Sequence, residues 1–341
     1  MLTVAIIGAG KISGGYDQSK LNQNGRGVFT HAGAYRKSGK YILETVCDLD
    51  EHRATAFQLH WGFARTLRSV EEIYSIFHDV VSICTPDETH YSIIKSLIGA
   101  KCCKCIFVEK PIAQTLEQIQ EIIELAAANK IAIIVNFQRR FDSVLADIRE
   151  KLTDGLSNLL AANAYYIKGL DHIGTTMLDT ITYILGYPNS LLAFNKIYNQ
   201  QVQDDTYEFV LFYTNFNITV KTVDSNQDEY NYHIFELDFL TRNERFCIND
   251  NSRQIEIRGL TNYAYSGVRI LDDHSLTRIQ TEYDISMIQT MSYIYGVVTG
   301  VVTHTINTPE HSYNVKLTID KIKQSYKTKE IIDIKVDEWK K

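Results

Sequence analysis

The stretch Val4–Gly10 near the N-terminus constrains the fold of this chain more than any other. A short Val/Ile run that enters a glycine turn directly predicts a buried strand followed by a tight bend. With Ser13 in place of the usual third glycine, the pattern reads Gly-x-Gly-x-x-Ser. Gly8 would permit the bend, and Gly10 would let the backbone approach a pyrophosphate, so the pattern predicts a dinucleotide-binding turn.

The residues after the turn would complete this site. Backbone N–H groups of Lys11, Ile12 and Ser13 at a helix start would face the phosphate charge. The polar segment Gly14–Gly27 has poor helical character, and a helical pattern resumes only near Thr30. This insertion is either a lid over the site or an ordinary surface loop.

The first 136 residues alternate between strand-like and helix-like segments, which predicts a doubly wound parallel sheet in an α/β domain. Two capping-box patterns, at Ser69 and Thr115, mark helix starts. The expected strands are Val4–Ile7, Ile42–Cys47, Val80–Cys84, Ile106–Val108 and Ile131–Val135. The expected helices are Thr30–Ser38, Glu51–His60, Ser69–Phe77, Tyr91–Gly99 and Thr115–Asn129.

From residue 137 to 341 the pattern changes to tyrosine-rich, alternating runs. These predict an α+β domain with a large, mostly antiparallel open sheet. Its expected strands are Asn163–Ile167, Leu191–Tyr198, Tyr207–Tyr213, Ile218–Val223, Tyr230–Phe239 and Gln254–Ile257. Its expected helices are Ser143–Leu152, Ser286–Thr303 and Pro309–Ser325.

Composition limits the partners of the chain. A length of 341 residues favours two domains, and a net charge of −6 without a dense basic run argues against nucleic acid or an anionic membrane surface. The N-terminus lacks a signal-peptide pattern, and the uncharged segment 285–309 is too polar for a membrane span, so a soluble cytoplasmic protein is expected. The six cysteines form no metal-site pattern, and no metal is predicted.

Asp48 follows the expected strand Ile42–Cys47 and is the candidate for binding ribose. A carboxylate there would accept hydrogen bonds from ribose hydroxyls and repel a 2′-phosphate, which favours NAD over NADP. The alternative is a loop residue or the cap of the next helix, and Asp50 could be that cap instead.

The run Cys105–Val108 followed by Glu109-Lys110-Pro111 predicts a buried strand with a lysine at its carboxyl end. Ligands of parallel sheets bind at that end, so the ammonium of Lys110 would stand beside a ligand. The alternative is a strand that ends in a solvated loop.

Several motifs together resemble the glucose–fructose oxidoreductase, inositol dehydrogenase and MocA (Gfo/Idh/MocA) family. They are Gly8–Gly10, Asp79–Pro86 with His90, Glu109–Pro111, Asn136–Phe141 and Gly169–Asp179. The resemblance implies a Rossmann domain, a second domain whose open sheet makes a homodimer or homotetramer, and hydride transfer at a sugar-like carbon. It also implies that Thr85, Pro86 and His90 border the nicotinamide, that Glu109 and Lys110 flank the reacting carbon, and that the Lys110–Pro111 bond is cis.

One position departs from the family pattern Asp-x-Gly-x-His-x-x-Asp. This chain has His172 where the pattern has its first Asp, and Thr176 where it has the histidine that handles the proton. A residue with a pKa near neutrality suits proton removal from a hydroxyl, and a nearby cation stabilises the alkoxide. His172 is therefore the candidate base and Lys110 its electrostatic partner or co-donor. The alternatives for His172 are substrate binding or packing.

The candidate substrate contacts are Arg139, Tyr166, Lys168, His172 and Thr176. Lys168, Gly169 and His172 resemble relatives in surface-polysaccharide pathways, which implies a sugar, specifically a nucleotide-linked sugar. Two other functions stay open: an NAD-binding regulatory protein without turnover, motivated by Thr176, and an NAD-using lyase or glycosidase.

Overall fold

The computed structural model describes residues 1–18, 27–154, 158–199, 203–223, 234–262 and 267–335. The chain forms two units, Met1–Phe141 with Asp284–Tyr313, and Asp142–Tyr283 with Asn314–Lys341. The division expected at residue 136 placed Asp284–Tyr313 in the second domain. The structure groups it with the first, because apolar side chains of the helix Ser286–Val298 (α9) join that unit's core.

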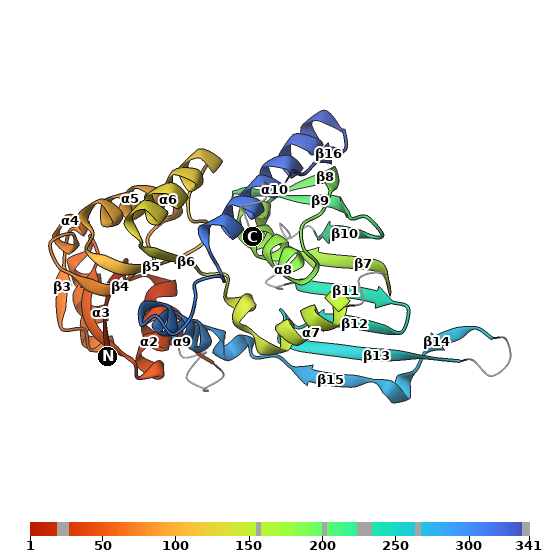
Figure 1. The fold of residues 1–341 in the computed structure, drawn as a ribbon, viewed down its shortest axis with the longest axis horizontal. Helices are drawn as coiled ribbons and strands as arrows, with labels where there is room; N and C mark the ends of the chain where they lie inside the picture. The colour runs from red at the N-terminus through yellow and green to blue at the C-terminus, as the bar shows by residue number, and fades with distance from the viewer. Residues whose placement is uncertain (19–26, 155–157, 200–202, 224–233, 263–266, 336–341) are drawn as a thin grey trace. The chain divides into compact units, whose positions relative to one another are not determined.

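The first unit is built on a six-stranded parallel sheet in the order β3-β2-β1-β4-β5-β6 (Figure 1). Its strands are β1 Leu2–Ile7, β2 Tyr41–Cys47, β3 Arg65–Leu67, β4 His78–Ile83, β5 Cys103–Val108 and β6 Ala132–Val135. The strand order reverses between β1 and β4, and ligands of such sheets bind at that point. The predicted doubly wound sheet is confirmed.

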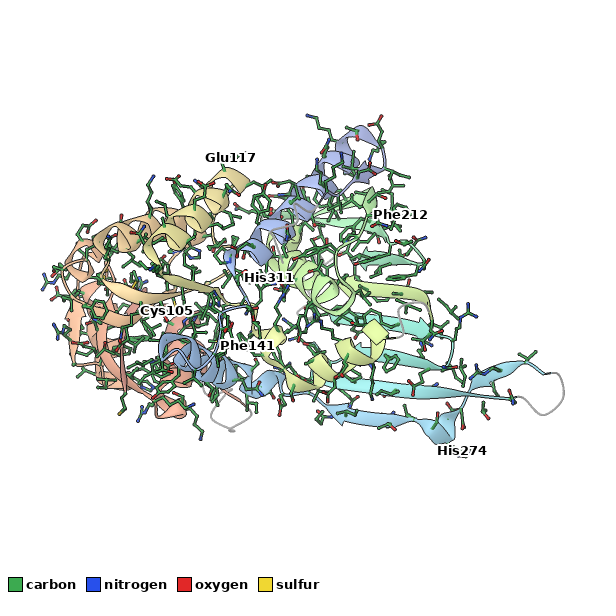
Figure 2. The ribbon with its side chains drawn as sticks, in the orientation of Figure 1. Cys105, Glu117, Phe141, Phe212, His274 and His311 are labelled. Carbon is green, nitrogen blue, oxygen red and sulfur yellow. The ribbon has the colours of Figure 1, made fainter. Side chains whose placement is uncertain are left out.

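Helices cover both faces of this sheet because successive strand residues point to opposite sides. Val4 and Ile6 of β1 pack with α2, α3 and α9, whereas Ala5 and Ile7 pack with α5 and α6. Cys105 of β5 lies within this unit (Figure 2). The helices are α1 Tyr16–Gln18, α2 His31–Ser38, α3 Glu51–Trp61, α4 Val70–Ile73, α5 His90–Ala100, α6 Leu116–Asn129 and α9 Ser286–Val298.

Side chains cap these helices as the sequence indicates. Thr30 accepts a hydrogen bond from the Gly33 N–H at the start of α2, and Thr115 caps α6 in the same way. The capping box at Ser69 is present, but α4 ends at Ile73 and not at Phe77, because the chain turns there to enter β4.

The second unit contains a ten-stranded sheet in the order β14-β13-β12-β11-β7-β10-β9-β8-β16, with β15 paired to β13. Neighbouring strands in its described part are antiparallel except β10, which runs parallel to β7. The strands are β7 Leu159–Tyr166, β8 Ser190–Asn199, β9 Asp204–Phe212, β10 Asn217–Thr222, β11 Phe235–Thr241, β12 Glu244–Asn249, β13 Gln254–Asn262, β14 Arg269–Leu271, β15 Thr277–Gln280 and β16 Ile332–Asp333. The predicted open, mostly antiparallel sheet is confirmed.

Three helices supply the core on one face of that sheet: α7 Ser143–Asp154, α8 Thr175–Leu185 and α10 Pro309–Thr328, of which α10 begins in the first unit. The strands alternate buried and partly exposed residues, as in β11. Sequence patterns missed β3, β12, β14, β15 and β16. Residues 19–26 of the insertion and 230–233 of an expected strand lie outside the described residues.

No helix in the described part of the chain is long and apolar enough to cross a membrane. Within the uncharged segment 285–309, residues Ser286–Val298 form the 13-residue helix α9, whose Met287, Met291 and Ile294 are fully buried. The prediction of a buried helix is confirmed for this part, but the helix ends at Val298 and not at the expected Thr303, and Val301 is 81% exposed.

Candidate active site

The glycine turn after β1 has the geometry that close backbone approach requires. Gly8 has a φ of +92°, and a Cβ there would lie 2.8 Å from the Cys84 carbonyl oxygen. A Cβ at Gly10 would meet nothing within 4 Å, so the backbone is open on that side. Ser13 Oγ accepts a hydrogen bond from the Gly10 N–H at 2.9 Å, so this serine closes the turn in place of the third glycine.

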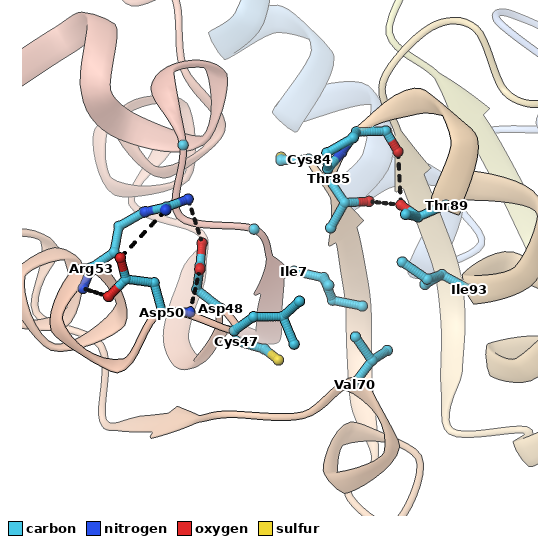
Figure 3. A pocket seen from close by; sticks show the side chains of 14 residues that line it. Ile7, Cys47, Asp48, Asp50, Arg53, Val70, Cys84, Thr85, Thr89 and Ile93 are labelled. Carbon is cyan, nitrogen blue, oxygen red and sulfur yellow. Dashed lines mark hydrogen bonds and ion pairs between the residues drawn. The ribbon is translucent and has the colours of Figure 1, made fainter.

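A cavity of about 710 Å³ lies in the first unit at the carboxyl ends of β1, β2 and β4 (Figure 3). Its size falls in the range of small-molecule and cofactor sites. The predicted cofactor residues that line it are Gly8, Gly10, Asp48, Thr85 and Pro86. Six others are not among its lining residues: Lys11, Ile12 and Ser13, which form a π-helical turn after Gly10, and His90, Glu109 and Lys110, which follow β4 and β5.

Asp48 follows β2, and its carboxylate contacts three neighbours at the cavity: Ala9 of the glycine turn, and Asp50 and Arg53 at the start of α3. Its carboxylate accepts hydrogen bonds from the Ala9 N–H at 2.8 Å and the Asp50 N–H at 2.9 Å. Asp50 caps α3 by accepting from the Arg53 N–H at 3.1 Å, so the cap is Asp50 and not Asp48. This leaves Asp48 facing the cavity as a ribose-binding carboxylate would.

Two lining residues beside Asp48 were missed. Leu49 is 86% exposed although it is apolar, and it borders the cavity. The Arg53 guanidinium lies 3.5 Å from the Asp48 carboxylate and 3.4 Å from that of Asp50 (Figure 3). Arg53 stands three residues after Asp50, and residues at this spacing lie on the same side of a helix, so the sequence indicated the contact of Arg53 with Asp50.

His90 is fully buried and links two loops. One ring nitrogen lies 2.9 Å from the Thr85 carbonyl oxygen, and the other lies 2.8 Å from that of Pro111. The Thr89 hydroxyl donates to the Thr85 hydroxyl at 2.7 Å. His90 therefore holds the loop after β4 against the loop that carries Lys110.

Glu109 follows β5 and is held by a buried network. Its Oε1 lies 3.0 Å from His31 Nε2, and it accepts from Asn136 Nδ2 at 2.6 Å. Burial opposes the charged form, but the His31 and Asn136 hydrogen bonds and the nearby Lys110 cation outweigh it and lower the pKa of this carboxyl. Glu109 is thus a fixed anion beside Lys110.

Lys110 stands at the tip of β5, and its peptide bond to Pro111 is cis, as the family resemblance implied. Burial lowers the pKa of its amine below the ordinary 10.5. The Glu109 and Asp87 carboxylates oppose this shift, and the Arg139 cation adds to it. A lysine with a lowered pKa at the carboxyl end of a parallel strand, where ligands of such sheets bind, is a candidate for proton or charge transfer.

His31 is a residue that sequence reasoning missed as part of the site. It is fully buried directly after the Thr30 cap, and its ring packs 4.5 Å from the Phe107 ring between centroids. A histidine at a helix start in an apolar setting was the available signal, but its partner Glu109 lies 78 residues away.

We expect His31→Ala to lower the free energy of unfolding by about 3 kcal/mol, because it removes a donor from a buried carboxylate. Urea denaturation of both proteins measures this difference. His52→Ala, at an exposed position on α3, is the control and should change stability by less than about 0.5 kcal/mol. Equal effects of the two substitutions would contradict a structural role for the network.

In the second unit, His172 lies in a π-helical turn, Gly169–Gly174, that leads into α8. Its side chain is half exposed, and Nδ1 lies 3.1 Å from Asp204 Oδ2. The neighbouring Asp171 carboxylate accepts from Lys323 Nζ at 2.6 Å. The side chain of Thr176, on the first turn of α8, is partly exposed.

Tyr166 was predicted to contact substrate, and this prediction is wrong. Its side chain is fully buried in the core, and its hydroxyl donates to the Tyr207 carbonyl at 2.8 Å and accepts from the Tyr207 N–H at 2.9 Å. Burial also raises the pKa of this phenol far above its usual range. Lys168 is partly exposed at the start of the turn, and Arg139 is buried in the first unit.

Asp204, at the start of β9, is the second residue that sequence reasoning missed. It binds the turn that carries His172 from 32 residues further along the chain. No local sequence pattern indicates Asp204, because its contact with His172 forms only when β9 lies against the turn Gly169–Gly174. Lys110 and His172 belong to different units, so their action on one hydroxyl stays a prediction.

Comparison with known proteins identifies the first unit. Residues 2–137 match the model of the oxidoreductase family GFO_IDH_MocA, described as an NAD-binding Rossmann fold. The matched segment contains β1 to β6 and the whole cavity lining.

Two curated relatives are similar over part of the chain. D-glucoside 3-dehydrogenase of Escherichia coli (strain K12) is 28% identical over 208 residues, which cover 55% of this chain and 55% of that protein. Inositol 2-dehydrogenase of Rhizobium meliloti (strain 1021) is 33% identical over 126 residues, 37% of each. The chain thus spans about half or less of these relatives' length.

Solved structures resemble the whole chain. Levoglucosan dehydrogenase in complex with NADH has a TM-score of 0.76 at 15% identity, and the match covers 98% of this chain and 99% of that one. At this identity the likeness shows the fold of both units. The family match itself covers residues 2–137, so it is this part of the chain, with the cavity, that is identified as an NAD-binding Rossmann domain of the Gfo/Idh/MocA oxidoreductase type.

Proposed function

We propose that this protein is an NAD-dependent oxidoreductase that transfers hydride between nicotinamide and a hydroxyl or keto carbon of a sugar. The observation that carries the proposal is Lys110. This lysine has a lowered pKa, stands at the tip of β5, and belongs to the same unit as the dinucleotide-type cavity. A lysine at a strand tip in a unit without such a cavity would not by itself indicate hydride transfer.

The cavity residues fit a dinucleotide. Because Gly8 has no Cβ and Gly10 is open, the backbone can approach a pyrophosphate, and Asp48 offers carboxylate oxygens to ribose hydroxyls. When bound, NAD supplies a nicotinamide ring that accepts or returns a hydride at the reacting carbon.

In the proposed reaction, the side chains of the protein remove the proton of the sugar hydroxyl and stabilise the negative charge that develops on its oxygen. In the direction of oxidation, His172 takes the hydroxyl proton of the sugar as its C–H hydride departs. The protonated Lys110 amine stabilises the negative charge that develops on that oxygen. Burial lowers the pKa of Lys110, and the Glu109 and Asp87 carboxylates act in the opposite direction, towards the protonated form.

The substrate class follows from several indications. The two curated relatives are named for action on a glucoside and on inositol, and the levoglucosan dehydrogenase was solved with NADH and levoglucosan. These support a sugar or polyol hydroxyl. The finer proposal is a nucleotide-linked sugar of surface-polysaccharide biosynthesis, handled by a homodimer or homotetramer, with Lys168 beside His172 in the substrate region.

A substrate panel tests the proposal. Purified protein is incubated with NAD and, in turn, free sugars, glucosides, inositols and nucleotide-linked sugars, and NADH is followed by its absorbance. We expect NADH with at least one member. Tight NAD binding without NADH from any member would favour the regulatory function that Thr176 motivated, and product without net NADH would favour a lyase or glycosidase.

We expect Asp48→Ser to reduce the ratio of NAD affinity to NADP affinity about tenfold or more. The substitution removes a carboxylate that accepts from ribose and repels a 2′-phosphate. Dissociation constants of both cofactors measured by calorimetry give this ratio. Glu124→Ser is the control: it removes an exposed carboxylate of α6 that does not line the cavity, and it should leave the ratio unchanged. An unchanged ratio in Asp48→Ser would contradict the ribose assignment.

A further inference from the structure

We infer that Asp204 is a positioning residue that fixes the tautomer and the orientation of His172. The inference rests on the proposed function, in which His172 is the base. It concerns how a chain with threonine at position 176 can still present an oriented imidazole.

The contacts of Asp204 converge on the turn that carries His172. Its Oδ2 accepts from the Asp171 N–H at 2.7 Å and from the His172 N–H at 3.2 Å. The same oxygen lies 3.1 Å from His172 Nδ1. The carboxylate side chain is only 7% exposed, so little water competes for it.

The turn is shaped to let the carboxylate approach. Gly169 has a φ of +85°, and a Cβ at this position would overlap the Asp204 carboxylate. The Gly169 N–H donates to Thr206 Oγ1 at 2.9 Å, two residues beyond Asp204 on β9. Lys168 also has a positive φ, of 65°. Two consecutive residues in the left-handed region thus wrap the turn around the start of β9.

Neighbouring carboxylates have different partners. Asp171 pairs with Lys323 at 2.6 Å, and Asp205 pairs with Lys196 at 2.8 Å. The ion pair that the structure gives for Asp204 is with His172. Among the described residues, Asp204 is therefore the carboxylate that forms an ion pair with the His172 imidazole.

This pairing has a chemical consequence. An ionised carboxylate only accepts hydrogen bonds, so His172 must carry a proton on Nδ1 to bind Asp204. In the neutral ring the lone pair is then on Nε2, the nitrogen that can take the hydroxyl proton. When the ring becomes an imidazolium, the carboxylate stabilises its charge, as a third group does for many catalytic bases.

The test compares Asp204→Asn with Asp205→Asn. An asparagine at 204 keeps the size of the side chain but carries no charge, so Nδ1–H loses its ionised acceptor, and an amide NH2 in the place of Oδ2 donates to Nδ1 and favours the other tautomer. Asp205→Asn is the matched control, because it removes a neighbouring charge that binds Lys196. Nitrogen-15 NMR of histidine-labelled protein, without substrate, reports the tautomer of His172, whose signals are assigned by their loss in His172→Gln.

We expect His172 to be protonated on Nδ1 in the wild type and in Asp205→Asn, and to move to Nε2–H in Asp204→Asn. On a substrate found by the panel, Asp204→Asn should lower kcat by about 10²- to 10⁴-fold with KM changed less than about threefold. An unchanged tautomer in Asp204→Asn, or equal effects of both substitutions, would overturn the inference. If the tautomer moves but the wild type oxidises no sugar, the positioning role stands and the proposed function fails.

Discussion

Lys110→Ala should lower kcat/KM for sugar oxidation by at least about 10³-fold. The substitution removes both the charge that stabilises the developing alkoxide and a candidate proton donor, and each such contribution is large in a buried site. Steady-state kinetics with the substrate found by the panel measure the loss. The binding of NAD should persist, because the cavity lining does not include Lys110.

Lys104→Ala is the matched control for that experiment. Lys104 lies on the same strand, β5, but is exposed and pairs with Asp79 at 2.7 Å. It should retain wild-type kinetics. Full activity in Lys110→Ala would remove Lys110 from the mechanism, whereas an equal loss in both variants would point to damage to β5.

The lowered pKa of Lys110 also gives the protein a signature in its pH profile. The contribution of the protonated amine is lost as pH rises through this pKa, so the basic limb of the pH profile should lie below pH 10.5. Glu109 raises the pKa of Lys110, and Glu109→Gln should therefore move the limb to lower pH. A limb that stays in place would contradict this coupling.

His172→Ala should lower kcat by about 10²- to 10⁴-fold, the usual contribution of a general base, with a smaller change in KM. Added imidazole should restore part of the rate, because the half-exposed position of the side chain leaves room for a small base. Initial rates with and without imidazole measure both effects.

His274→Ala, at an exposed position in the second unit (Figure 2), is the control and should behave as the wild type. A change confined to KM in His172→Ala would demote His172 to substrate binding. A normal kcat would shift the acid–base work to Lys110 alone, which is the alternative that threonine at position 176 leaves open.

The first unit could be predicted closely because its signals are local. The Val/Ile run before Gly8, the caps at Thr30 and Thr115, and the strand before Lys110 each depend on neighbours in sequence. The helix α9 was assigned to the wrong domain for the opposite reason. Its buried Met287 and Met291 indicate a core, but the sequence does not say which core, and the partners lie more than 150 residues away.

The site in the second unit shows where sequence reasoning ends. His172 was found through a motif, but Asp204 could not be, since it meets the turn only through the placement of β9. Tyr166 was assigned to substrate because it precedes the motif, yet strand alternation turns it into the core, where Tyr207 satisfies its hydroxyl. In the first unit, the contact of His31 with Glu109 joins segments 78 residues apart in the same way.

The central claim is that this chain moves a hydride from a sugar carbon to NAD with the aid of Lys110. The most direct measurement uses a panel sugar that carries deuterium on its carbinol carbons, with mass spectrometry of the reduced cofactor. The account predicts one deuterium in the NADH made by the wild type and by Lys104→Ala, and labelled NADH formed at least about 10³-fold more slowly by Lys110→Ala. Unlabelled NADH from the wild type, or equal labelling by Lys110→Ala at the wild-type rate, would contradict it.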